Sequence, residues 1–104
     1  MTSSAHLDRM FRPQSVAIIG ASNDPTRISG RTLRYLREGG YQGAVYPINP
    51  TRETVQGLRA YSRLGDVPER PDVAIIAVPG AAAREAVKDC ADAGVRSVIL
   101  FSSG

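Results

Sequence analysis

A short apolar run, a turn of small residues and a helical pattern follow one another in residues 15–33. Val16–Ile19 is rich in β-branched residues, and Gly20, Ala21 and Ser22 come directly after it. A helical pattern then begins near Ser29. A strand, a tight turn and a helix start in this order expose backbone N–H groups and the positive end of the helix dipole. The stretch therefore predicts a phosphate-binding corner in an open α/β sheet.

The remaining long elements alternate between strands and helices. Their apolar runs are continuous rather than alternating, which indicates strands that are covered on both faces. The predicted strands are Ser15–Ile19, Ala44–Ile48, Asp72–Val78 and Ser97–Phe101, and the predicted helices are Gly30–Glu38, with Ser29 as its N-cap, and Ala81–Ala93. This order predicts an α/β fold, with a Rossmann-like open, mostly parallel sheet and helices on both faces.

Shorter elements fill the rest of the chain. We expect a short helix within Met1–Pro13, a turn over Thr51–Val55 that Gly57 ends, and a single turn over Ser62–Asp66. Leu58–Tyr61 is predicted to be a brief strand near a sheet edge.

Composition limits the classes of partner. The 104 residues fit one domain, residues 1–104, and 42% of them are apolar and 22% charged. A net charge of +3 suits a small anionic ligand and does not favour nucleic acid. The chain has no signal-peptide core and no stretch of membrane-spanning length, and its single cysteine forms no internal disulfide. We therefore expect a cytoplasmic protein with no nucleic-acid or membrane partner.

Four segments follow the carboxyl ends of the predicted strands, where open α/β sheets bind ligands. They are Gly20-Ala21-Ser22, Asn49-Pro50, Val78-Pro79 and Phe101-Ser102-Ser103. None of them contains a carboxylate, an imidazole or a thiol, so no nucleophile–base pair or metal site can be assembled there. We interpret His6 as a solvated terminal residue and Cys90 as part of the apolar stripe of its helix. This edge is predicted to bind a ligand rather than to perform chemistry.

Basic residues line one flank of the first long helix. Arg27, Arg31, Arg34 and Arg37 recur at helical spacing. We expect Arg34 and Arg37 to be solvated. Arg27 lies near the helix start, where the dipole disfavours a cation, so a bound anion would compensate it. Arg27 is therefore a candidate phosphate ligand.

A dinucleotide is one candidate ligand. A dinucleotide-binding site typically has the motif G-x-G-x-x-G at the first turn and an acidic residue at the end of the second strand. The sequence has Ser22 in place of the second glycine and Asn49 in place of the acid. Both observations argue against NAD; a scaffold without any ligand also remains an alternative.

The order IIGAS…RISGRTLRYL, VYPINP, QGLRAY, DVAIIAVP and VILFSSG resembles the CoA-binding domain of NDP-forming acyl-CoA synthetases. That family includes ADP-forming acetyl-CoA synthetases and the α subunit of succinyl-CoA synthetase. The resemblance extends from about Leu7 to Gly104 and implies that coenzyme A is the ligand. The family often has a lysine just after its NP pair, whereas this sequence has Thr51 and then Arg52, so Arg52 is the expected replacement.

The resemblance implies three groups of CoA contacts. The turn Gly20–Asp24 would surround the phosphates together with Arg27 and Arg52, Val78-Pro79 would flank the adenine or the pantetheine arm, and Phe101–Ser103 would line the path of the thiol. The full set of expected CoA-binding residues is Gly20, Ala21, Ser22, Asn23, Asp24, Arg27, Asn49, Pro50, Arg52, Val78, Pro79, Phe101, Ser102 and Ser103.

The resemblance also implies an enzyme larger than this segment. In such ligases a phosphorylated histidine and a nucleotide-grasp domain form the acyl-CoA, and His6 does not match that histidine. ATP or ADP would act only through those other domains, so the remaining domains or subunit are expected partners. We expect the segment to be the N-terminal domain of a longer protein, because it stops just beyond a core strand. A stand-alone CoA-binding carrier or regulator and a fused synthetase–acetyltransferase are open alternatives.

Overall fold

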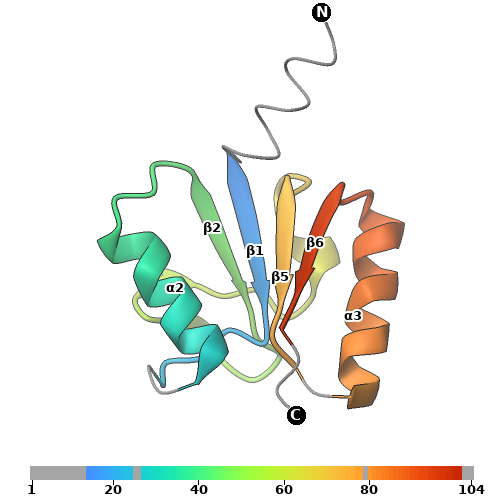
Figure 1. Cartoon of the computed structure of the whole chain (residues 1–104), viewed down its shortest axis with the longest axis horizontal. Helices are drawn as coiled ribbons and strands as arrows, with labels where there is room; N and C mark the ends of the chain where they lie inside the picture. The colour runs from blue at the N-terminus through green and yellow to red at the C-terminus, as the bar shows by residue number, and fades with distance from the viewer. Residues whose placement is uncertain (1–13, 25–26, 79, 102–104) are drawn as a thin grey trace, which may run out of the picture.

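The core of the protein is a four-stranded parallel sheet (Figure 1). The computed structural model describes residues 14–24, 27–78 and 80–101. The sheet has the order β2-β1-β5-β6, and its strands are β1 (Ser15–Ile19), β2 (Ala44–Ile48), β5 (Val73–Ile76) and β6 (Ser97–Leu100). The predicted open parallel sheet is confirmed.

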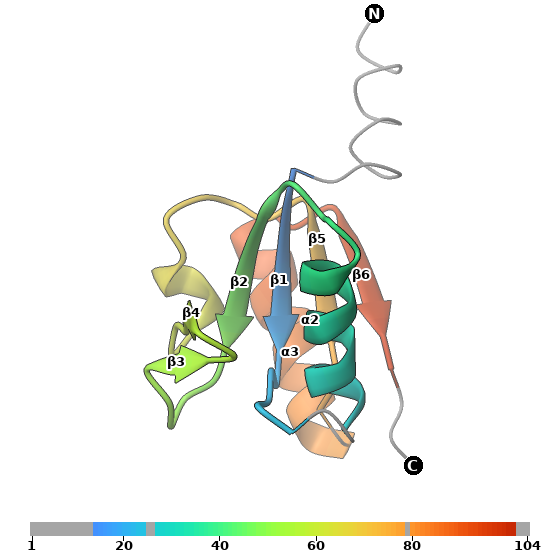
Figure 2. The same cartoon turned by 90° about the vertical axis from the view of Figure 1, so that its left-hand side faces the viewer.

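Two helices cover the sheet on opposite faces. Figure 2 shows α2 (Ile28–Glu38) in front of the sheet and α3 (Gly80–Ala93) behind it. Alternate residues of β1 serve the two faces: Val16 and Ile18 belong to one buried cluster, and Ala17 belongs to the other. Burial on both faces explains why the strand sequences are apolar at every position.

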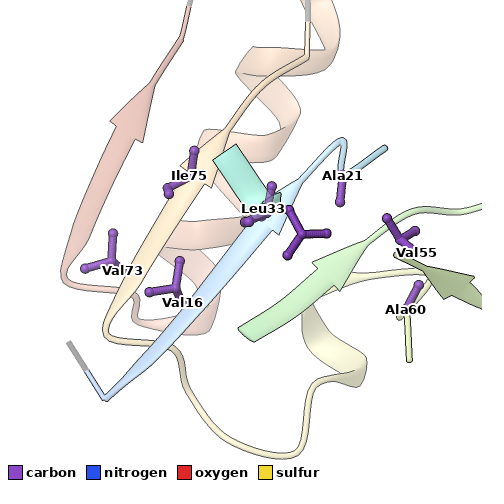
Figure 3. Close-up of a cluster of buried hydrophobic side chains, with 8 residues drawn as sticks. Val16, Ala21, Leu33, Val55, Ala60, Val73 and Ile75 are labelled. Carbon is purple, nitrogen blue, oxygen red and sulfur yellow. The ribbon is translucent and has the colours of Figure 1, made fainter. Parts of the chain in front are cut away.

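Leu33 of α2 belongs to the first cluster. It is completely buried, and Figure 3 shows it over β1, in the cluster that also contains Val16, Val73 and Ile75. The second cluster contains Cys90 of α3, which is also completely buried. The interpretation of Cys90 as a core residue is therefore confirmed, and burial raises the pKa of its thiol, with a smaller contribution from the nearby Asp89 carboxylate.

A small hairpin follows β2. Its strands are β3 (Thr54–Val55) and β4 (Leu58–Arg59), which pair antiparallel, and a short 3-10 helix η1 (Leu64–Asp66) comes next. Gln56 and Gly57 connect the two strands with φ angles of 50° and 80°. Two consecutive left-handed residues are typical of the tightest hairpin turns. The hairpin therefore depends on a backbone conformation that is unusual for glutamine.

This hairpin corrects two sequence predictions. Thr54–Val55 is a strand, whereas we predicted a turn over Thr51–Val55. Tyr61 does not continue β4, because it forms an isolated parallel bridge with Ile48 of β2 instead. The error arose because each of these strands has only two residues, too few for a periodicity to be visible.

The boundaries of the longer elements also differ slightly from prediction. Helix α2 begins at Ile28, so Ser29 lies inside the helix, and the N-cap is Arg27, which makes no side-chain capping bond. Strand β5 is Val73–Ile76, shorter than the predicted Asp72–Val78 at both ends. Asp72 precedes the strand and makes hydrogen bonds at the start of the sheet. Its N–H donates to the Ser15 carbonyl at 3.1 Å, and its carboxylate accepts the Gln14 N–H at 2.8 Å.

Some predictions lie outside the described residues. They concern the helix in residues 1–13, His6, Pro79, Ser102 and Ser103. Within the described ranges, neither α2 nor α3 has the length and apolar character needed to span a lipid bilayer.

Candidate functional site: the carboxyl edge of the sheet

The strand order reverses between β1 and β5. From β1 the chain moves outward to β2 through α2, and it later returns to the other side of β1 to form β5. Open α/β sheets bind ligands at the carboxyl edge beside such a reversal. In this protein Gly20 follows β1, and Ala77 and Val78 follow β5. These residues therefore lie at the position where a ligand is expected.

Gly20 allows the two sides of the reversal to approach closely. Its φ of 86° is left-handed, and a Cβ atom there would lie 2.5 Å from Val78 Cγ1 and 2.8 Å from the Ala77 carbonyl oxygen. Any other residue would push the β1 turn away from β5. The prediction that small residues shape this turn therefore has a specific steric reason at Gly20.

The N–H groups of the turn are partly used within the fold. Those of Gly20 and Ala21 donate to the Ile48 carbonyl of β2 at 3.1 and 3.3 Å, and that of Asp24 donates to Ser22 Oγ at 3.0 Å. Among the described residues, the N–H groups of Ser22 and Asn23 have no acceptor. Within the turn Gly20–Asp24, the N–H groups that a phosphate could use are therefore those of Ser22 and Asn23.

Helix α2 packs directly against this turn at Gly30. A Cβ atom on Gly30 would lie 2.0 Å from the Asp24 carbonyl oxygen and 3.0 Å from that of Ser22. This close approach of the helix to the turn is therefore possible only because residue 30 has no side chain. It brings the start of the helix against the turn that is expected to hold phosphate.

Gln56 ties the hairpin to the same turn, and sequence analysis missed it. Its Nε2 donates to the carbonyls of Ser22 at 3.0 Å and Gly30 at 2.8 Å, and its backbone N–H donates to Asn23 Oδ1 at 2.6 Å. Arg37 donates in turn to the Gln56 carbonyl, so Arg37 is not merely solvated as predicted. No local pattern marks Gln56, because the residues to which its N–H groups donate lie 26 to 34 residues away.

Asn49 connects the β1 turn with the loop after β2. Its Nδ2 donates to the Ala21 carbonyl at 3.0 Å. Its Oδ1 accepts bonds from the Thr51 N–H, the Thr51 hydroxyl and the Arg52 N–H at 2.9, 2.9 and 3.2 Å. An aspartate could accept these bonds but could not donate to Ala21. This explains why an amide, and not an acid, follows β2.

The predicted cationic ligands lie on the solvent-facing side of these loops. Arg27 is exposed at the start of α2, and its N–H donates to the Asp24 carbonyl at 3.2 Å. Arg52 is exposed and follows the exposed Pro50 in the loop that Asn49 organises. Arg34, by contrast, pairs with Glu38 at 3.0 Å on the outer surface of α2, as expected for a solvated flank.

The other predicted residues occupy the same edge on the far side of β1. Val78 is partly buried beside Gly20, and the Phe101 N–H donates to the Ile76 carbonyl at 2.9 Å, just beyond β6. The structure thus brings Gly20, Asn49 and Val78 together, while Phe101 lies two strands away from β1. Within the described part of the chain, no group of three histidine, cysteine, aspartate or glutamate side chains could hold a metal.

Comparison with known proteins identifies the family. Residues 14–104 match the model of the CoA binding domain family. The chain is 39% identical to the α subunit of ADP-forming acetate–CoA ligase II from Pyrococcus furiosus, over 94% of this chain and 21% of that protein. It is 34% identical to trans-feruloyl-CoA synthase FCS1 from an unknown prokaryotic organism, over 98% of this chain and 14% of that protein.

A solved structure shows the same architecture. Acetyl-coenzyme A synthetase 1 of Candidatus Korarchaeum cryptofilum, solved with phosphate and ADP, superposes with a TM-score of 0.88 and 43% identity, over 94% of this chain and 21% of that one. The chain therefore spans about a fifth or less of these relatives. The match over residues 14–104, supported by this superposition, shows that the chain belongs to the CoA-binding domain family.

Proposed function

We propose that this chain binds coenzyme A as the N-terminal domain of an ADP-forming acyl-CoA synthetase. The observation that carries the proposal is the turn after β1, which packs against the start of α2 at Gly30 and whose Ser22 and Asn23 N–H groups have no acceptor among the described residues. Backbone donors at a helix start form a phosphate site, and family membership favours CoA over NAD as the source of that phosphate. Because the relatives are several times longer, formation of the acyl-CoA belongs to other domains or subunits.

The expected ligands have distinct roles in this proposal. Ser22, Asn23, Arg27 and Arg52 hold the CoA phosphates, and Gly20, Ala21, Asp24 and Pro50 shape the turns around them. Asn49 is a positioning residue, because its amide connects both turns. Val78 and Pro79 flank the adenine or the pantetheine arm, and Phe101, Ser102 and Ser103 line the path of the thiol. The cytoplasmic location expected from the sequence is part of the same proposal.

Calorimetric titration with CoA tests this function. Ser22→Asp places a carboxylate against the phosphates, and we expect it to weaken CoA binding at least about tenfold. Gln42→Asp is the matched control, because it adds the same charge on an exposed loop before β2, at the opposite edge of the sheet, and should leave binding unchanged. Absence of CoA binding by the unaltered protein would refute the function; unchanged binding by Ser22→Asp would remove this turn from the site.

A further inference from the structure

Gln56 occupies a backbone position that is unfavourable for its residue type. It is the first of the two left-handed residues that connect β3 and β4, with a φ of 50°, and Gly57 is the second. Tight hairpin turns of this kind favour asparagine, aspartate or glycine at the first position. Other residues are disfavoured there, because their Cβ atom comes too close to the following carbonyl oxygen. The turn itself therefore gives no reason for a glutamine, and we look for the reason in the contacts of its side chain.

The side-chain amide of Gln56 connects the turn after β1 with the first turn of α2. Its Nε2 donates to the Ser22 carbonyl at 3.0 Å and to the Gly30 carbonyl at 2.8 Å. These two bonds use both N–H groups of the amide. Since both partners are acceptors, they also determine which end of the amide faces them. The amide thus fixes the Ser22 carbonyl relative to the start of α2.

The bond to Ser22 also determines where the next N–H group points. The Ser22 carbonyl and the Asn23 N–H belong to one peptide group, which is planar and trans, so they point in opposite directions. With its carbonyl bonded to Gln56, this peptide group directs the Asn23 N–H away from the hairpin. Among the described residues that N–H has no acceptor. A hydrogen bond to the carbonyl also polarises the peptide group and strengthens its N–H as a donor.

Further contacts hold Gln56 in this arrangement. Its backbone N–H donates to Asn23 Oδ1 at 2.6 Å, and Arg37 of α2 donates to its carbonyl. The preceding Val55 is completely buried in the cluster that contains Ala21 of the turn (Figure 3). The hairpin is therefore docked against the turn through an apolar contact on one side and hydrogen bonds on the other.

A cavity of about 530 Å³ lies beside these hydrogen bonds. It is lined by Asn23, Arg34, Arg37, Glu38 and Gln56. The hairpin and α2 are thus not closely packed next to the turn on this side. The orientation of the Ser22–Asn23 peptide group therefore depends on the hydrogen bonds of Gln56 rather than on packing.

We infer that Gln56 is a positioning residue for the phosphate-binding turn. It orients the Ser22–Asn23 peptide group before the ligand arrives, so that the Asn23 N–H is already directed away from the hairpin and available to an anion. Both amide N–H groups of Gln56 are used within the fold, so it acts through this peptide group and not by contact with the ligand. The inference rests on the proposed function, which supplies the anion as a phosphate of CoA.

Calorimetric titration with CoA and NMR relaxation of the backbone amides in the ligand-free protein test the inference. Gln56→Met keeps the length of the side chain and removes both donors. We expect CoA to bind about three- to tenfold more weakly, because binding must then also order the turn. The order parameter of the Asn23 amide should fall from about 0.85 toward about 0.6. Gln42→Met makes the same substitution at an exposed position before β2 and should change neither quantity.

Gln56→Gly separates positioning from support of the hairpin. Glycine adopts a left-handed φ without strain, so this variant keeps a favourable turn while it lacks the amide. We expect the same loss of CoA affinity and of Asn23 amide order as for Gln56→Met. This variant also provides the comparison if Gln56→Met does not fold.

Unchanged CoA affinity in the Gln56 variants would overturn the inference while leaving the proposed function intact. Weaker CoA binding with an unchanged Asn23 order parameter would also overturn it, because Gln56 would then not orient this peptide group. If the unaltered protein does not bind CoA, the proposed function fails, and the Asn23 order parameter decides about Gln56 alone. A loss of order in the variants would support its positioning role, and unchanged order would overturn it.

Discussion

Gly30 lets α2 pack closely against the turn after β1 because it has no side chain. In an open helix, replacing glycine with alanine stabilises by about 1 kcal/mol. At Gly30 the added Cβ would lie 2.0 Å from the Asp24 carbonyl oxygen, which belongs to backbone that cannot rotate away. We therefore predict that Gly30→Ala reverses the usual sign and lowers the free energy of unfolding by about 1–3 kcal/mol.

Urea unfolding monitored by circular dichroism measures this effect. Gly65→Ala serves as the control, because nothing lies within 4 Å of a Cβ atom at that position. A Gly30→Ala protein that is as stable as the unaltered one, or more stable, would show that the turn and helix are not in tight contact.

At the scale of elements, Tyr46 links β2 to the segment before β5. Its hydroxyl donates to Glu69 Oε2 at 2.5 Å, and this bond, together with partial burial, raises the pKa of Tyr46 to about 12. The unfolded chain loses the same proton near pH 10. The bond therefore contributes its full stabilisation below pH 10 and loses it as the pH rises from about 10 to 12.

The free energy of unfolding of the unaltered protein and of Tyr46→Phe, measured between pH 8 and 11.5, tests this linkage. We expect the advantage of the unaltered protein to shrink above about pH 10. Tyr35→Phe, at an exposed position on α2, should follow the unaltered protein throughout. A difference between Tyr46→Phe and the unaltered protein that is independent of pH would contradict the assigned bond.

At the scale of the whole molecule, the sheet ends in an apolar edge. Val98, Ile99 and Leu100 of β6 are 40%, 46% and 54% exposed. The register pairs Val98 with Ala74 and Ile99 with Ile75, so the exposed side chains lie on both faces of the sheet. An apolar edge strand of this kind favours association.

We predict that the 104-residue chain self-associates through this edge as its concentration rises. Ile99→Lys should shift the protein toward monomer in sedimentation velocity, because an edge lysine opposes strand pairing. Tyr35→Lys adds the same charge on an exposed part of α2 and should leave association unchanged. A chain that stays monomeric at all concentrations would show that β6 is not an associating surface.

The sequence by itself determined the main elements and their order. The continuous apolar run Val16–Ile19 predicts a strand, and the helical spacing of the apolar stripe that contains Cys90 predicts a helix. Both signals can be recognised from residues that are close together in the sequence. Alternation of these elements then predicts a parallel sheet, because connections between parallel strands require a crossover. The matching order of motifs along the chain was enough to predict the family.

Only the tertiary structure decided how the site is assembled. The Ile48 carbonyl takes the N–H groups of Gly20 and Ala21, Asn49 spans two loops, and Gln56 reaches a turn and a helix about 30 residues away. The hairpin that carries Gln56 and Arg59 has strands of two residues each, which leave no periodic signal. A hydrogen bond between distant residues depends on the packing that brings them together, and no local pattern of residues encodes that distance.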